Sequence, residues 1–334
     1  MPLRTKRLLE QLSALWKRGD LRLAPGTATE DTDAWSSTAP QDPQALGPSR
    51  AKSQAGTLER AVDEGGLRAC DLSSAIEESK LNLHYQPKLR LRSRGVDGCE
   101  ALIRWAHPAL GLLNPDQIVP LAERSGLMRA LTEWVLARAR DDWCVLREVG
   151  LATRLYVNVA GNILNDRAFI DHVLAATAVN PEAIGLEITE TEIIPDPDQA
   201  LAHLQELADA GLRISIDDYG AGLSSLSYLK RLPAHELKID RAFISDITRS
   251  HRDPLLVRST IDLAHALGLE VTAEGVETST AQALLTVMGC DLVQGFGIAR
   301  PMALPQLVEY LQLAREQRDD EPVTLPFKSA ASQD

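Results

Sequence analysis

The sequence predicts an α/β protein folded as a (β/α)8 barrel of the TIM type. Eight short apolar segments follow one another between residues 81 and 295, and a helical pattern follows most of them. Strands and helices that alternate in this way form a parallel sheet, and eight such units close into a barrel. A doubly wound open sheet is the rival fold, but it would carry a glycine-rich first crossover, which this sequence lacks.

Each predicted strand is a short run of mainly aliphatic residues. Helical patterns between the strands cover residues 127–149, 200–210 and 255–267. The link between the first two strands is short and rich in Arg and Gly, which leaves no room for a helix. We therefore expect the first strand to be antiparallel to the second. The strands are expected at residues 81–86, 99–105, 155–158, 184–189, 214–217, 237–240, 271–274 and 292–295.

Three further segments are predicted around the barrel domain, which we place at residues 58–318. Leucines and Trp16 recur at helical spacing in residues 1–20, which predicts a short amphipathic helix. Two uses stay open for this helix: binding a membrane surface or an unknown partner, and docking on its own domain. Residues 21–57 are rich in Pro, Ser, Thr, Ala, Gly and Asp, which predicts a disordered linker before the barrel. Residues 319–334 are expected to form a flexible tail.

The composition restricts the partner and the compartment. The 334 residues carry a net charge of −12, which disfavours a nucleic-acid polymer as partner because such binding normally needs a basic surface. No run of about 18 apolar residues exists, so no transmembrane helix is expected. Four widely spaced cysteines without a CxxC pair argue against a zinc site and suit a reducing compartment. We therefore expect a cytoplasmic protein.

Polar side chains recur near the C-terminal ends of the predicted strands. Barrel interiors are normally filled by Val, Ile and Leu, and an uncompensated buried charge costs several kcal/mol. The C-terminal strand ends meet at one mouth of such a barrel, so these side chains should form a single ring. Their oxygen atoms suit Mg²⁺ or Mn²⁺, and no histidine lies among them. The residues are Glu100, Asn158, Glu187 and Glu190, Asp217 and Asp218, Lys238, Glu274 and Glu277, and Gln294.

Asp217 and Asp218 are the most informative pair of this ring. Adjacent strand residues point to opposite faces, so the two carboxylates can share a site only where the strand ends and its pleat breaks down. At about 4 Å the two charges repel by roughly 4 kcal/mol at an effective dielectric near 20, which a cation or a proton would relieve. Aspartate and glycine are also common in turns, so a plain turn stays an alternative for this pair taken alone.

A series of separated motifs makes the sequence recognisable. In their order, the motifs closely resemble those of the EAL-domain phosphodiesterases, which hydrolyse cyclic di-GMP. The resemblance extends over about residues 70–316 and implies a metal-dependent phosphodiesterase that converts cyclic di-GMP to linear pGpG in bacterial second-messenger signalling. The motifs are YQP at 85–87, EALIRWAHP at 100–108, VNV at 157–159, LEITE at 186–190, DDYGAG at 217–222, LKIDR at 237–241, AEGVE at 273–277 and QGF at 294–296.

The resemblance implies a site for two divalent ions, Mg²⁺ or Mn²⁺. In the family, residues at the positions of Glu100, Asn158, Glu187 and Asp217 hold the first ion. Asp217 and its neighbour Asp218 reach the second ion. The family also implies a homodimer, coupled to metal binding through the loop that follows the aspartate pair.

Three residues match catalytic positions of the family. Lys238 matches the lysine that orients the attacking water. Glu274 matches a residue that takes part in activating this water, and Gln294 one that supports the geometry of the site.

Four more residues match positions around the substrate. Gln86 and Arg104 match residues that contact the phosphates of the dinucleotide, and Glu277 one near a guanine base. An ion pair inside the barrel mouth is the alternative use of Arg104. Glu190 matches a glutamate that holds the loop after the aspartate pair, so its implied role is structural and regulatory.

Two other functions stay open beside the phosphodiesterase. A catalytically silent receptor would use the same pocket for cyclic di-GMP, but such receptors are expected to lack Glu100, Lys238 or Glu274, and all three are present. An unrelated barrel enzyme would use Lys238 as a Schiff base, as in aldolase-like chemistry. No GG(D/E)EF-type signature occurs, so synthesis of cyclic di-GMP is not expected.

Overall fold

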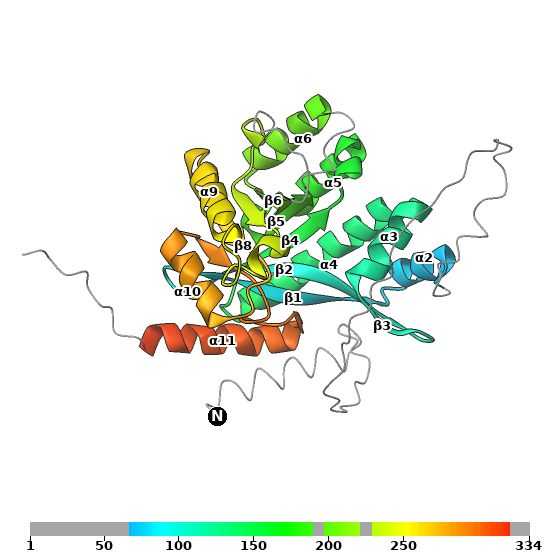
Figure 1. Cartoon of the computed structure of the whole chain (residues 1–334). Coiled ribbons are helices and arrows are strands. Elements are labelled where there is room, and N and C mark those ends of the chain that lie inside the picture. Colours follow the sequence, from blue (N-terminus) through cyan, green and yellow to red (C-terminus); the bar gives the residue numbers. More distant parts are fainter. Residues whose placement is uncertain (1–66, 190–196, 221–228, 321–334) are drawn as a thin grey trace, which may run out of the picture. The chain divides into compact units, whose positions relative to one another are not determined.

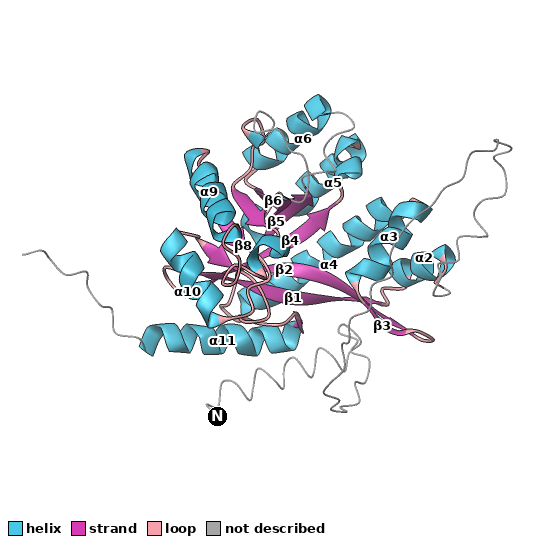
Figure 2. Cartoon of the chain, viewed as in Figure 1, coloured by secondary structure: helices cyan, strands magenta, loops and turns pink. Residues whose placement is uncertain are grey.

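The computed structural model describes residues 67–189, 197–220 and 229–320. Over these residues the strands close into a barrel, with helices on its outside (Figures 1 and 2). The helix predicted at 1–20 and the linker predicted at 21–57 lie outside the described residues, as does the tail from residue 321 onward. Among the described residues, no helix is both long and apolar enough to cross a bilayer.

In the described part of the chain, eight strands make the barrel wall and two short ones extend it. Strand β1 is antiparallel to both β2 and β9, and the other neighbouring barrel strands pair in parallel. The predicted barrel with an antiparallel first strand is thus confirmed. The short strands β3 and β10 were not predicted. The strands are β1 (Leu81–Arg90), β2 (Val96–His107), β3 (Gly111–Leu113), β4 (Arg154–Val159), β5 (Ile184–Thr189), β6 (Arg213–Tyr219), β7 (Glu236–Ile239), β8 (Glu270–Ala273), β9 (Leu292–Val293) and β10 (Met302–Ala303).

Helices follow most of the strands and cover their outer faces. The three helical patterns read from the sequence correspond to α4, α6 and α9, each within a few residues of the predicted bounds. The helices are α2 (Ala69–Glu77), α3 (Pro115–Ser125), α4 (Met128–Glu148), α5 (Arg167–Thr177), α6 (Pro197–Asp209), α8 (Arg241–Ile244), α9 (Asp253–Ala266), α10 (Ser279–Met288) and α11 (Leu304–Asp320), with the 3₁₀ turns η1 (Gly161–Asn165) and η2 (Pro181–Ala183).

The hairpin of β1 and β2 is longer than the sequence predicted. Its pairing runs from Leu81 opposite Trp105 to Leu89 opposite Val96, with a register shift near the turn. Of the extra residues on β1, Pro87 and Lys88 pair with β2 and Arg90 pairs with β9, whereas Leu89 pairs with both strands. This register sets Gln86 directly opposite Glu100, at the mouth of the barrel.

The two faces of the barrel strands differ in polarity. Lys88 on β1 contacts Glu236 on β7 at 2.8 Å, although these strands are not neighbours in the sheet, so both side chains must point into the barrel. Alternate residues on the parallel strands point the other way, toward the helices, and form an aliphatic core. Its central members include Leu155, Val157, Leu186, Ile188, Ile214, Ile216, Leu237, Ile239 and Val271, all fully or almost fully buried.

Helix α3 starts at the edge of the barrel mouth because its sequence carries a strong start signal. Pro115 occupies the first helical position, and Gln117 Oε1 accepts a hydrogen bond from the N–H of Asn114 at 3.2 Å. The helix ends at Gly126, which has a left-handed φ of 71°. These signals place Pro115 and Asp116 beside the mouth, where both line cavities described below.

Candidate active site at the barrel mouth

A bulge in β6 brings the two adjacent aspartates to one site. The register of β6 against β7 shifts between Ile216 and Tyr219. Within this stretch Asp218 has a left-handed φ of 53°, and its N–H donates to Asp217 Oδ1 at 2.9 Å. The bulge breaks the alternation of faces, so carboxylate oxygens of Asp217, Asp218 and Glu274 lie within 4.8 Å of one another. The pair shares one site at the end of its strand, as the sequence led us to expect.

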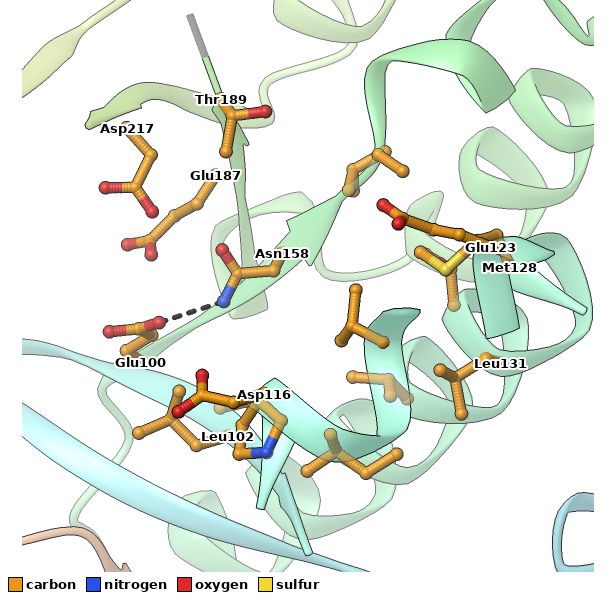
Figure 3. A pocket seen from close by; sticks show the side chains of 18 of the residues that line it. Glu100, Leu102, Asp116, Glu123, Met128, Leu131, Asn158, Glu187, Thr189 and Asp217 are labelled. Carbon is orange, nitrogen blue, oxygen red and sulfur yellow. Dashed lines mark hydrogen bonds between the residues drawn. The ribbon is translucent and has the colours of Figure 1, made fainter. Parts of the chain in front are cut away.

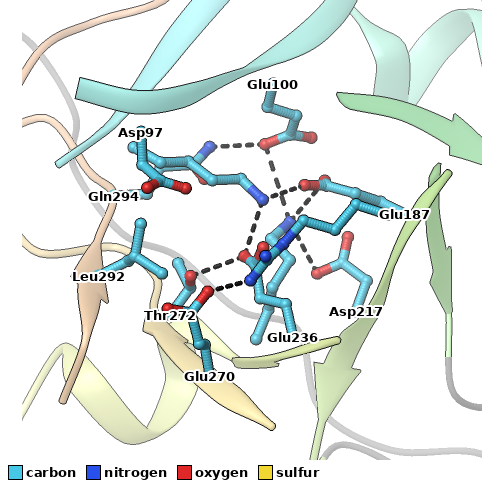
Figure 4. A network of polar contacts seen from close by, with 12 residues as sticks. Asp97, Glu100, Glu187, Asp217, Glu236, Glu270, Thr272, Leu292 and Gln294 are labelled. Carbon is cyan, nitrogen blue, oxygen red and sulfur yellow. Dashed lines mark hydrogen bonds and ion pairs between the residues drawn. The ribbon is translucent and has the colours of Figure 1, made fainter. Parts of the chain in front are cut away.

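Lys238 on β7 lies in the middle of four carboxylates. Its Nζ is 2.6 Å from Glu274, 2.7 Å from Glu187, 2.9 Å from Asp217 and 3.9 Å from Glu100. Figure 4 shows Glu100, Glu187 and Asp217 converging on this point from different strands. The Lys238 side chain is 1% exposed. The ammonium group of Lys238 cannot balance four ionised carboxylates, so the site favours a further cation or bound protons.

Two amide side chains fix the carboxylate of Glu100. Asn158 Nδ2 donates to Glu100 Oε1 at 2.9 Å, the bond drawn in Figure 3. Gln294 Nε2 donates to Glu100 Oε2 at 2.6 Å and to Gln86 Oε1 at 3.2 Å. Gln86 is held in turn by a bond from its Nε2 to the carbonyl of Ala299, at 3.0 Å. Because Asn158 uses its nitrogen for Glu100, its oxygen is the atom that could ligate a cation.

Burial raises the pKa of three carboxyl groups in this ring. The pKa of Glu187 rises to about 7, because the cost of burying its charge exceeds the attraction to Lys238. The pKa of Glu274 rises to about 8, again through burial, and the nearby charge of Asp217 adds to the effect. Burial and then Asp217 raise the pKa of Asp218 to about 6. A further cation would stabilise the ionised form of all three groups.

The charge state of Lys238 restricts its chemistry. Burial alone would lower its pKa, but the surrounding carboxylates, Asp217 foremost, raise it well above the ordinary value. Lys238 is therefore an ammonium group at neutral pH, which donates hydrogen bonds and cannot attack a carbonyl. This argues against the aldolase-like alternative, which needs a neutral lysine.

The donor atoms of the ring fit a hard divalent cation. Among the described residues, Asp217, Asp218 and Glu274 form a group with the spacing of metal ligands. Glu100, Glu187 and Asn158 add oxygen atoms from three further strands, and neither histidine nor cysteine is part of the set. Carboxylate and amide oxygens are the ligands that Mg²⁺ and Mn²⁺ prefer.

A cavity of about 450 Å³ opens beside the ring. Glu100, Asn158, Glu187, Asp217 and Asp218 line its polar end. Its other end is apolar and lies between α3 and α4, as Figure 3 shows for Met128 and Leu131. The cavity thus combines a charged end with an apolar arm, as ligand pockets commonly do.

A second cavity, of about 410 Å³, lies on the other side of Glu100. Gln86, Arg104 and Glu277 line it, together with Glu274 and Gln294. The two cavities share Glu100, Leu102, Pro115 and Asp116 in their walls, so one elongated ligand could extend into both.

Arg104 is largely buried in the wall of the second cavity. Its Nη1 donates to the carbonyl of Ile103 at 2.8 Å, and burial lowers the pKa of its guanidinium. The residue is 9% exposed, so an anion that reached its guanidinium would be shielded from water. Glu277 lies at the exposed rim of the same cavity.

The structure gathers eleven of the twelve predicted site residues at one mouth. Glu190 lies outside the described residues, so its predicted role stays a prediction. The sequence interpretation missed a second group of polar side chains deeper in the barrel: Lys88, Glu236 and Thr272. The sequence held a signal for them, because alternate strand residues share a face. Lys88 lies two positions after Gln86, and Glu236 and Thr272 lie two positions before Lys238 and Glu274.

Comparison with known proteins agrees with this geometry. The family described as "EAL domain" matches residues 69–301 of the chain. The bifunctional diguanylate cyclase/cyclic di-GMP phosphodiesterase MucR of Pseudomonas aeruginosa is 42% identical over 242 residues, which cover 71% of this chain and 35% of that protein. The cyclic di-GMP phosphodiesterase NbdA of the same organism is 41% identical over 265 residues, which cover 77% of this chain and 33% of that protein. The chain thus spans about a third of the length of these relatives.

Solved structures show the same fold. The MucR phosphodiesterase in complex with cyclic di-GMP matches with a TM-score of 0.67 and 41% identity, covering 71% of this chain and 98% of that one. The EAL enzyme Bd1971, bound to cAMP and cyclic di-GMP, matches with a TM-score of 0.68 and 29% identity, covering 72% of this chain and 67% of that one. The barrel, its ring of carboxylates and these matches lead to one conclusion: the chain belongs to the EAL-domain family of cyclic di-GMP phosphodiesterases.

Proposed function

We propose that this chain hydrolyses cyclic di-GMP to linear pGpG with the help of two divalent ions, Mg²⁺ or Mn²⁺. The observation that carries the proposal is the ring of carboxylates around Lys238, with the Asp217–Asp218 pair at the β6 bulge and a cavity on either side. Relatives named as cyclic di-GMP phosphodiesterases, such as NbdA, support the choice of reaction, and a relative solved with cyclic di-GMP supports the choice of ligand.

The ring has the residues to hold the ions. Glu100, Asn158, Glu187 and Asp217 would hold the first ion, and Asp217 with Asp218 the second. Bound there, two divalent ions would acidify a water molecule and neutralise charge on the phosphoryl oxygens. Phosphodiesters resist water strongly, and enzymes that cleave them lower the barrier by about 20 kcal/mol. Burial and the crowding of carboxyl groups raise the pKa values of Glu187 and Glu274, which supports a cation in this place because it would stabilise their ionised forms.

The protein's own groups would orient the attack and move the proton. Lys238, held as an ammonium group, would donate a hydrogen bond to the attacking water and so fix its direction. Glu274 lies 2.6 Å from Lys238 Nζ and would accept a proton from the same water. Gln294 would keep Glu100 in its orientation through the 2.6 Å bond described above.

The two cavities suit a ligand with two bases and a charged centre. Arg104 and Gln86 would contact the phosphates, since a guanidinium fork pairs with two oxygens of one phosphate. Glu277, at the rim of the second cavity, would accept hydrogen bonds from a guanine edge. A homodimer and a cytoplasmic location are further predictions from the sequence, and the molar mass in solution would test the first.

The decisive experiment separates turnover from binding. The purified protein is incubated with cyclic di-GMP and Mn²⁺, with and without excess chelator, and the products are separated by chromatography. We expect pGpG only when the metal is present, and none from Glu100→Gln, in which the carboxylate is replaced by an amide of the same size. Cyclic di-GMP that binds in the presence of Mn²⁺ but stays intact would favour the silent receptor instead.

A further inference from the structure

A second layer of polar side chains lies directly beneath the ring. Along β1 the inward residues are Gln86 and then Lys88, and along β7 they are Lys238 and, one step deeper, Glu236. Thr272 on β8 occupies the same depth and donates to Glu236 Oε1 at 2.7 Å. We call Lys88, Glu236 and Thr272 the inner layer. None of the three lines either cavity, so a ligand in those cavities would not touch them.

Lys88 is the cation of the inner layer, and it cannot exchange with solvent. Its side chain is 0% exposed, as are those of Glu236 and Glu187. Its Nζ lies 2.8 Å from Glu236 Oε1 and 2.5 Å from Glu187 Oε1. It also lies 3.5 Å from the centre of the Tyr156 ring, a cation–π distance. Three partners on three different strands therefore fix the position of one ammonium group.

Glycines on the two neighbouring strands leave space for the Tyr156 ring on which Lys88 packs. The Tyr156 ring fits between Gly98 on β2 and Gly185 on β5, where a Cβ atom would come within 2.6 and 2.5 Å of the ring. Glycine at these two positions lets a large aromatic ring lie inside the barrel, and Lys88 packs on its face. The site of Lys88 is thus defined by packing as well as by charge.

Glu187 connects the two layers. Its Oε2 is 2.7 Å from Lys238 in the ring, and its Oε1 is 2.5 Å from Lys88 in the inner layer (Figure 4 labels Glu187 and Glu236). A divalent ion at the mouth would compete with Lys238 for the outer oxygen. It would not reach the inner oxygen, which lies on the side of the closed inner layer.

We propose that Lys88 is a positioning residue for the divalent ion: it holds the inner oxygen of Glu187 so that the outer oxygen faces the mouth in a fixed direction. This inference rests on the proposed function, because it takes Glu187 as a metal ligand. Partners behind a ligand commonly set its orientation, and their loss typically costs about 10-fold to 100-fold in metal affinity.

The rival explanation is that Lys88 only neutralises Glu236. Removing Lys88 alone would not separate the two, because Glu236 would be left as a buried and unbalanced charge, and Lys88→Met could simply unfold. The double variant Lys88→Met/Glu236→Gln removes both charges, keeps similar side-chain volumes and leaves an oxygen for Thr272. The single variant Glu236→Gln is the matched control, because it keeps Lys88 on Glu187.

The experiment measures Mn²⁺ affinity without nucleotide, by electron paramagnetic resonance of the free ion. Thermal unfolding in chelator first verifies that each variant folds cooperatively. We expect Glu236→Gln to bind Mn²⁺ like the wild type and the double variant to bind it about 10-fold more weakly or worse. In hydrolysis assays the double variant should lose kcat at limiting Mn²⁺, recover it at high Mn²⁺ and keep its KM for cyclic di-GMP.

Two results would overturn the inference in different ways. If the wild type binds Mn²⁺ and hydrolyses cyclic di-GMP while the double variant binds the ion equally well, Lys88 merely balances Glu236 and the proposed function stands. If the wild type takes up no Mn²⁺, the proposed function fails and the role of Lys88 fails with it.

Discussion

Lys238 is the residue on which the charge balance of the mouth depends. Without its ammonium group, Glu187, Asp217 and Glu274 would face one another with only Lys88 nearby. We expect Lys238→Met to lower the free energy of unfolding by about 3–5 kcal/mol in chelator, as measured by urea titration. Added Mn²⁺ should restore more stability to this variant than to the wild type, since the ion replaces the missing cation.

A surface lysine provides the control for Lys238. Lys80 pairs with Glu78 at 2.6 Å, but both side chains are more than half exposed. Lys80→Met should therefore change the free energy of unfolding by less than about 0.5 kcal/mol. Equal losses in the two variants would contradict the view that the ring depends on Lys238.

The raised carboxyl pKa values predict how stability depends on pH. Glu187 and Glu274 have pKa values of about 7 and about 8 in the folded protein, against an ordinary value of 4.5. The folded state therefore holds more protons than the unfolded state between these limits, so the free energy of unfolding falls as pH rises from about 5 to about 8. Urea titrations in chelator at several pH values would measure this slope.

Two variants, one at a buried carboxyl group and one at an exposed one, test whether the buried groups cause this dependence of stability on pH. Glu274→Gln carries no titratable group at that position, so it should flatten the dependence on pH. Glu309→Gln changes an exposed carboxylate on α11 and should keep the wild-type slope. A flat wild-type profile would mean that the buried carboxylates titrate as freely in the folded chain as in the unfolded one.

At the scale of an element, the β6 bulge brings the aspartate pair to the site at a cost in stability. Asp218 combines a left-handed φ of 53° with a carboxylate held close to that of Asp217. Asp218→Gly and Asp218→Ala both remove the charge, but only glycine also removes the Cβ that makes this conformation unfavourable. We expect the glycine variant to be more stable than the alanine variant by about 1 kcal/mol in urea unfolding, and both to lose hydrolysis.

The contact of β1 with α4 makes a second prediction at this scale. Tyr85 points outward from β1, and its hydroxyl donates to Asp142 Oδ2 at 2.6 Å, where Asp142 is 4% exposed and also paired with Arg138. Tyr85→Phe leaves this buried carboxylate with one partner fewer, so we expect a loss of about 1–3 kcal/mol in the free energy of unfolding. A double-mutant cycle with Asp142→Asn would isolate the pair, and additive losses would contradict it.

The sequence alone predicted the features of the fold and the site that depend on local patterns. The eight apolar segments predicted the barrel strands, and the short link between residues 86 and 99 predicted the antiparallel hairpin, because strand periodicity and loop length are local properties. The Asp217–Asp218 site was also predictable, since two adjacent carboxylates require a break in the pleat. The contact of Lys88 with Glu236 was not, because it depends on how far each strand extends below the mouth. That depth is set by the closure of the whole barrel.

At the scale of the whole molecule, a divalent ion should act as a bridge between distant parts of the chain. The candidate ligands Glu100, Asn158, Glu187 and Asp217 come from β2, β4, β5 and β6, which the unfolded chain does not hold together. An ion that binds only the folded state stabilises it by about 2.7 kcal/mol at 100 times its dissociation constant. We therefore expect Mn²⁺ to raise the urea midpoint of the wild type without changing the slope of the transition, because the surface exposed on unfolding stays the same. Asp217→Asn, which keeps the size of the side chain but not its charge, should lose most of this increment, whereas an undiminished increment in that variant would place the ion elsewhere in the protein.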